Sequence, residues 1–140
     1  MVRLKLKATP LKFKKKCAMS GIEFIADTNT LLYIINEYPC VQPFLDMRTG
    51  VSVITEMELL SYSKITTADD IVLRNLISKC AVISINKQIK ERAILLRRKY
   101  GTKLPDAIVA ATAIECELPL VTADKGFKKI EELDLRLLEI

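Results

Sequence analysis

The sequence contains no histidine, and this absence excludes several classes of catalytic site at once. Ser-His-Asp and Cys-His nucleophile systems need an imidazole, and so does acid–base catalysis by a histidine pair. Zinc sites of the usual Cys and His type are excluded too, because Cys17, Cys40, Cys80 and Cys116 are widely spaced and form no CxxC pair. Any enzymatic chemistry must therefore depend on carboxylates, lysines, hydroxyls or a bound ion.

Long apolar runs and glycine-rich turns are also missing. No segment approaches the about 20 apolar residues that span a bilayer, and the basic N-terminus lacks the apolar stretch of a signal peptide. The cysteine spacing shows no disulfide framework, so we expect a reduced, cytoplasmic protein without a membrane segment. With only four glycines, the chain has no Gly-rich turn of a dinucleotide-binding domain.

Acidic residues are absent from the first 20 positions, which hold seven of the 22 cations. Residues 21–140 keep 15 cations against all 17 acids, so the net charge of +5 belongs to the N-terminal segment. We therefore expect a basic N-terminal extension at 1–20 and one domain at 21–140. The extension has two open interpretations: an arm that contacts nucleic acid, or an upstream addition before a natural start at Met19.

From residue 22 onward, segments typical of strands alternate with segments typical of helices. Strands are predicted at 22–26, 51–54, 81–85, 118–123 and 135–140. Helices are predicted at 28–37, 41–47, from 55, 67–79, 86–100, 105–115 and 126–132. This alternation predicts an α/β fold: a single-domain, three-layer sandwich with a mostly parallel central sheet.

Capping signals set several of the predicted helix boundaries. Thr55 with Glu58, and the same spacing from Thr67, predict capping boxes for the second and third long helices. Asn86 is predicted to cap the following long helix, which should end at Gly101.

Four acids stand where a strand gives way to a helix, or in the first turn of a helix. They are Asp27, Glu58, Asp106 and Asp124. Each alone is readily explained as a cap, a turn residue or a first-turn acid that the helix dipole stabilises. Strand ends of a parallel sheet meet at one edge, however, so together they predict a cluster.

A cluster of carboxylates requires compensation. Two carboxylates about 4 Å apart repel by about 4 kcal/mol at an effective dielectric near 20, so four would need protons or a cation. Oxygen ligands without His or Cys select hard ions, which indicates Mg²⁺ or Mn²⁺. Such an ion activates water and supports in-line phosphoryl displacement, which suits cleavage of a phosphodiester.

The motifs around these acids resemble those of the PIN domain family, and more closely its VapC-type toxins. The matching segments are IADTN, SVITEMELL, KLPDAIVAATA and LPLVTADKGF, which with their spacing cover essentially all of residues 22–140. The resemblance implies a PIN-like, Rossmann-like nuclease domain with metal-dependent endoribonuclease activity. It also implies a toxin of a type II toxin–antitoxin pair, acting on RNA, usually homodimeric and inhibited by a cognate antitoxin protein.

Carried over by motif, the resemblance makes Asp27, Glu58, Asp106 and Asp124 the catalytic, metal-binding acids. Asn29 resembles the residue that orients the first acid, and Thr122 resembles the hydroxyl of the Thr-x-Asp motif. Glu56 competes with Glu58 for the second acid, but the family pattern places its acid just before the Leu pair. Gly126 is a departure, because many members have another acid there.

Other functions stay open from the sequence alone. A non-catalytic RNA-binding or assembly module could keep the fold, although the four intact acids argue against it. A haloacid-dehalogenase-like phosphatase would need a second Asp where Asn29 stands. The candidates for contact with an RNA backbone are Lys103, Lys125, Arg97 and Arg98, against the usual case of a solvated helix surface.

Overall fold

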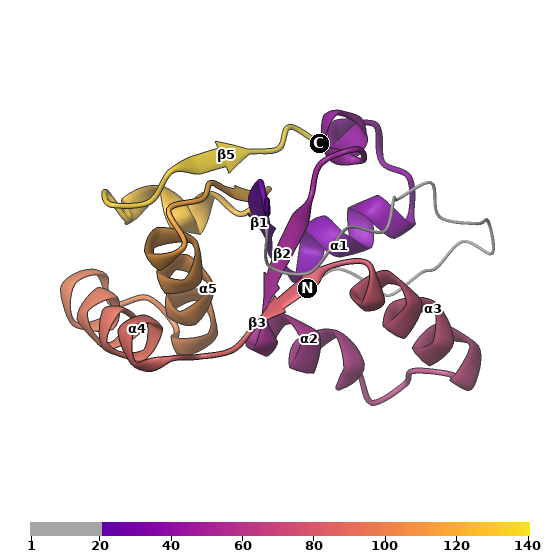
Figure 1. The fold of residues 1–140 in the computed structure, drawn as a ribbon, viewed down its shortest axis with the longest axis horizontal. Coiled ribbons are helices and arrows are strands. Elements are labelled where there is room, and N and C mark those ends of the chain that lie inside the picture. Colours follow the sequence, from indigo (N-terminus) through magenta and orange to yellow (C-terminus); the bar gives the residue numbers. More distant parts are fainter. Residues whose placement is uncertain (1–20) are drawn as a thin grey trace.

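The computed structural model describes residues 21–140 and shows one five-stranded sheet with helices on both faces (Figure 1). Expectations for the basic extension lie outside these described residues. The strands run in the order β3-β2-β1-β4-β5, and all four pairings are parallel. Their bounds are β1 Phe24–Ala26, β2 Thr49–Ser52, β3 Ala81–Ile83, β4 Leu120–Thr122 and β5 Leu135–Leu137. The predicted α/β sandwich with a parallel sheet is confirmed.

The helices divide between two hydrophobic cores, one on each face of the sheet. They are α1 Thr28–Ile35, α2 Val53–Leu60, α3 Thr67–Ser78, α4 Lys87–Tyr100 and α5 Leu104–Glu115, with the 3₁₀ helices η1 Pro39–Phe44 and η2 Lys125–Lys129. Phe24 and Ala26 belong to the core with α1 and α3, whereas Ile25 belongs to the core with α4 and α5. This alternation along β1 is the period of a strand buried on both faces. No helix within residues 21–140 is long and apolar enough to cross a membrane.

The start of α2 corrects one predicted boundary. The strand predicted at 51–54 lies at Thr49–Ser52, and Ser52 rather than Thr55 is the N-cap, with its hydroxyl accepting a hydrogen bond from the Ile54 N–H at 3.2 Å. Thr55 is buried within the helix. The predicted capping box of Thr55 with Glu58 is therefore wrong, because the helix has already begun when the chain reaches Thr55. Glu58 is left free of any capping role.

The boundary of α3 is displaced by one residue from the predicted one. Thr66 and Asp69 form the capping box, with Asp69 N–H bonded to Thr66 Oγ1 at 3.0 Å, where Thr67 and Asp70 were predicted to do so. Neighbouring threonines and aspartates at the same spacing make the two choices indistinguishable in sequence. Elsewhere most elements are shorter than predicted, α5 begins one residue earlier, and the two short helices predicted at 41–47 and 126–132 are 3₁₀ helices, but all occur in the predicted order.

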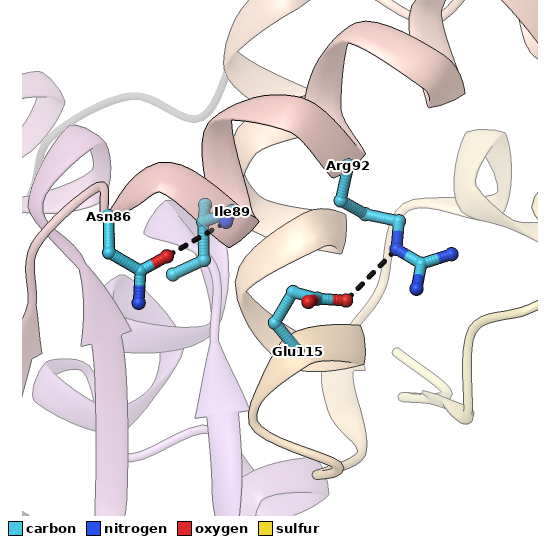
Figure 2. A network of polar contacts seen from close by, with 4 residues as sticks. All are labelled: Asn86, Ile89, Arg92 and Glu115. Carbon is cyan, nitrogen blue, oxygen red and sulfur yellow. Dashed lines mark hydrogen bonds and ion pairs between the residues drawn. The ribbon is translucent and has the colours of Figure 1, made fainter.

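The pair α4 and α5 follows the predicted signals closely. Asn86 caps α4 by accepting from the Ile89 N–H at 2.8 Å, and Gly101 ends it in the left-handed region at φ 66°. Figure 2 shows this cap beside the ion pair in which Arg92 Nε lies 3.0 Å from Glu115 Oε2, joining α4 to α5. Small buried side chains along α5 pack against the sheet, and its first turn is placed at the carboxyl edge of the strands.

Candidate active site

The carboxyl ends of β1 and β4 lie side by side and carry the first site residues. In the parallel register Ala26 pairs with Val121, so Asp27 and Thr122 each follow a paired residue at the same edge. A cleft of about 560 Å³ opens there. Its lining residues are Asp27, Thr28, Asn29, Glu58, Ser61, Tyr62, Ser63, Asp106, Val109 and Asp124. The four sequence-predicted acids therefore line one cleft.

Asp27 is the fixed member of the four. Its side chain is 8 % exposed, and its Oδ1 accepts from the Thr30 N–H at 2.9 Å and lies 2.7 Å from the Thr30 hydroxyl. The Thr122 hydroxyl donates to the other oxygen, Oδ2. Burial raises the pKa of Asp27, because it outweighs these hydrogen bonds, which favour the ionised form. Asp27 also caps α1, so the capping interpretation of this residue is correct but incomplete.

Thr122 links the first acid to the fourth. Its Oγ1 donates to Asp27 and accepts from the Asp124 N–H at 3.0 Å, so the backbone entering η2 is tied to the first acid. The Asp124 side chain accepts from the Gly126 N–H at 2.8 Å and caps η2. A Cβ at Gly126 would stand 3.0 Å from Asp124 Oδ1, so the departure at this position leaves the Asp124 carboxylate uncrowded.

Glu58 reaches the cleft from the last turn of α2. The Thr28 hydroxyl at the start of α1 donates to Glu58 Oε1 at 3.0 Å, which turns this carboxylate toward the first acid. Glu56 lies two residues earlier, in a different direction around the helix, and is not among the residues that line the cleft. Of the two glutamates, Glu58 is therefore the one at the cleft.

The pKa of Asp106 is affected by the charges of all three other acids. Asp106 lies in the first turn of α5 and is half-buried. Burial raises its pKa most, and the negative charges of Asp124, Glu58 and Asp27 raise it further, whereas Lys103 acts in the opposite direction. Four carboxylates from four separate segments therefore form one electrostatic unit.

The donor set fits a hard divalent cation. The cleft offers carboxylate oxygens and no nitrogen or sulfur ligand, which suits Mg²⁺ or Mn²⁺. Within residues 21–140 no three of these side chains already stand at the spacing of a formed metal site. Glu58 and Asp124 are exposed, so side-chain rotation can bring their oxygens toward the fixed Asp27.

Two neighbours of the acids were not predicted from sequence. Thr30, three residues after Asp27, contacts its carboxylate with both N–H and hydroxyl, whereas Asn29, predicted to orient this acid, is a residue of the cleft lining. The signal for Thr30 was the spacing of an N-cap to N3, which specifies the N–H but not the hydroxyl. Tyr62 lines the cleft from the loop after α2, and no sequence pattern singled it out.

The four cations predicted to contact RNA lie in different surroundings. Lys103 precedes α5 and is close enough to affect the pKa of Asp106, and Lys125 follows Asp124 directly. Arg97 Nε donates to the Thr102 carbonyl at 3.2 Å and so stabilises the end of α4. Neither Arg97 nor Arg98 lines the cleft. Lys103 and Lys125 do not line it either: Lys103 acts on the charge of Asp106, and Lys125 lines a separate cavity with Leu137 of β5.

Comparisons with known proteins identify a family and several similar structures. The family model described as the PIN domain matches residues 24–133. A toxin–antitoxin complex from Klebsiella pneumoniae contains a chain 31 % identical, with a TM-score of 0.68 over 79 % of this chain and 95 % of that one. Among curated proteins, no match was found.

Two further solved structures share the fold at lower identity. DNA-bound VapBC from Salmonella typhimurium is 22 % identical, with a TM-score of 0.73 over 82 % of this chain and 97 % of that one. VapBC2 from Rickettsia felis, bound to a promoter DNA fragment, is 23 % identical, with a TM-score of 0.71 over 83 % and 98 %. The family match covers the four acids and the strands and helices around them, so the chain belongs to the PIN domain family, and its structural neighbours support the VapC type within it.

Proposed function

We propose that this protein is a metal-dependent endoribonuclease and the toxin of a type II toxin–antitoxin pair. The observation that carries the proposal is the convergence of Asp27, Glu58, Asp106 and Asp124 on one open cleft, with each of the other three charges acting on Asp106. Like charges held so close favour a site completed by a cation. Family membership supports nuclease chemistry at this cleft.

The residues divide into a fixed and an adjustable group. Asp27, held by Thr30 and Thr122, supplies a preoriented oxygen, while Glu58, Asp106 and Asp124 complete the ligand set. A bound Mg²⁺ or Mn²⁺ supplies Lewis-acid activation of water and neutralises charge on the phosphodiester. The pKa values of Asp27 and Asp106 are both raised, so these two acids favour a proton more than free carboxylates do in the absence of a cation.

The proposed contacts with RNA involve two lysines, and the proposed protein partner is argued from the structural neighbours. Lys103, whose charge acts on Asp106, and Lys125, which follows Asp124 in the chain, are the cations proposed to contact phosphates of the RNA. The structural neighbours include toxin–antitoxin complexes, which supports a cognate antitoxin as the protein partner. The homodimer is proposed from the family resemblance alone. A small reading frame beside the gene, whose product co-purifies with this protein and blocks cleavage, would be the expected antitoxin.

Cleavage of pooled RNA tests the proposal. We expect fragments with Mg²⁺ or Mn²⁺, none with chelator, and none from folded Asp27→Asn or Asp106→Asn. Glu58→Gln should lose activity far more than the matched control Glu56→Gln, because only Glu58 lines the cleft. Undiminished cleavage in chelator would contradict the mechanism. No cleavage under any condition would favour the non-catalytic RNA-binding or assembly module.

A further inference from the structure

The Thr30 side chain stands between the first acid and the strand that carries the fourth. It is fully buried, and its hydroxyl oxygen lies 2.7 Å from Asp27 Oδ1 and 2.7 Å from the Val121 carbonyl oxygen. Val121 belongs to β4 and is 91 residues away in sequence. One hydroxyl therefore contacts both α1 and β4 at the floor of the site.

These contacts continue on the other side of the carboxylate. Thr122 follows Val121 in β4, donates to Asp27 Oδ2 and accepts from the Asp124 N–H. Asp27 is thus held on one oxygen by Thr30 and on the other by Thr122. Because Thr30 also contacts the backbone of β4, its position affects both the rotation of Asp27 and the separation of Asp27 from Asp124.

The hydroxyl is needed for this arrangement, beyond the backbone of Thr30. The Thr30 N–H already caps Asp27 Oδ1 at 2.9 Å, as any residue other than proline at this position would. The hydroxyl carries one proton and faces two acceptors, so it donates to one of them at a time, and an ionised carboxylate is the stronger acceptor. A valine would fill the same space and keep the backbone cap, but it would remove both hydroxyl contacts.

We propose that Thr30 is a positioning residue, whose hydroxyl fixes the Asp27 carboxylate relative to β4 and thereby sets the geometry of the cation site. The inference rests on the proposed function, since it concerns the same cleft. Partners that orient a metal ligand without touching the metal typically contribute 10- to 100-fold in affinity or activity. Thr30→Val should therefore weaken cation binding by about tenfold, the lower end of that range, because two hydrogen bonds to Asp27 remain.

The test is calorimetric titration of the full chain with Mn²⁺ alone, for wild type, Thr30→Val, Thr30→Ser and Thr112→Val. Thr112 is a matched control: it is equally buried, and its hydroxyl donates to the Ile108 carbonyl within α5 at 2.7 Å. We expect weaker binding only for Thr30→Val, with Thr30→Ser close to wild type. In RNA cleavage, kcat should fall for Thr30→Val while KM for RNA stays unchanged, since the substrate contacts are intact.

Two outcomes would overturn the inference in distinguishable ways. Mn²⁺ binding by Thr30→Val equal to wild type, or equally weakened by Thr112→Val, would show that Thr30 is only a core residue and would leave the proposed function standing. Absence of Mn²⁺ binding by wild type would overturn the metal site itself, and with it the proposed function. Should Thr30→Val fail to fold, Thr30→Ala is measured in the same way.

Discussion

Neutralising Asp106 should stabilise the metal-free protein, which is the opposite of what a capping residue would do. In Asp106→Asn the side chain keeps its shape but loses the charge that Asp124, Glu58 and Asp27 repel. A unit charge about 8 Å from another is repelled by about 0.5 kcal/mol in bulk water and about 2 kcal/mol at an effective dielectric near 20. Because the cleft is open to water, we take about 0.5 to 1 kcal/mol for each of the three neighbours, or about 1.5 to 3 kcal/mol in total.

The summed relief is then about 1 to 2 kcal/mol, after subtracting the favourable dipole interaction that a first-turn acid loses on neutralisation. For a domain of this size that corresponds to an increase in Tm of about 3 to 8 °C. The pH dependence has a definite sign. Since the folded pKa of Asp106 lies above the unfolded one, its contribution to stability is present at low pH and is lost as pH rises through the folded pKa. The advantage of Asp106→Asn should therefore grow from mildly acidic to neutral pH.

Thermal melting in chelator measures this effect, with Asp70→Asn as the matched control. Asp70 is also a first-turn aspartate of a 12-residue helix, but its carboxylate contacts Arg74 at 2.9 Å instead of other acids. Asp70→Asn should leave Tm unchanged or lower it slightly, as expected for an exposed ion pair. Mg²⁺ at a hundredfold excess over Kd should stabilise wild type by about 2.7 kcal/mol, and Asp106→Asn by less. A lower Tm for Asp106→Asn together with no effect of Mg²⁺ on either protein would show that the acids are caps.

Three other expectations concern the products, the substrate and the link between the acids. Cleavage products should carry 5′-phosphate and 3′-hydroxyl ends, because water is the attacking group; cyclic phosphate ends would contradict this chemistry. In an Asp106→Asn background, Tyr62→Trp would introduce the sole tryptophan of the chain, and its fluorescence should be quenched when single-stranded RNA stacks on it. Tyr38→Trp places the tryptophan outside the cleft and should show no quenching. Thr122→Val should reduce cleavage 10- to 100-fold at unchanged KM, since it removes the bond to Asp27; unchanged kcat would refute that role.

Local patterns were sufficient to predict the fold. Alternating apolar segments, the Asn86 cap and the Gly101 terminus each act within a few residues, so the order and type of elements could be read from sequence. The start of α2 could not be predicted from such local patterns. Ser52 and Thr55 are both good N-caps, and the choice depends on how far β2 pairs with its neighbours, which is a tertiary property.

The convergence of the four acids could be predicted from sequence, whereas the residues that contact them could be predicted only in part. The four carboxylates stand at strand and helix ends, where the topology of a parallel sheet brings them to one edge. Thr30 and Tyr62 reach the site through contacts with β4 and through a loop, and neither contact leaves a periodic signal in sequence. Asn29 lines the cleft as its motif predicts, and its role in orienting Asp27 stays a prediction beside the hydrogen bonds from Thr30 and Thr122.

We propose that four carboxylates from separate segments hold one kind of cation in one cleft. Crystals grown with Mn²⁺ and measured at a wavelength with anomalous signal would locate that ion directly. We predict an anomalous peak in the cleft, with oxygens of Asp27 and Asp106 about 2.0 to 2.3 Å away and further acids of the cluster around it. A peak elsewhere on the protein with none in the cleft, at Mn²⁺ concentrations that support cleavage, would contradict a cation site at the four acids.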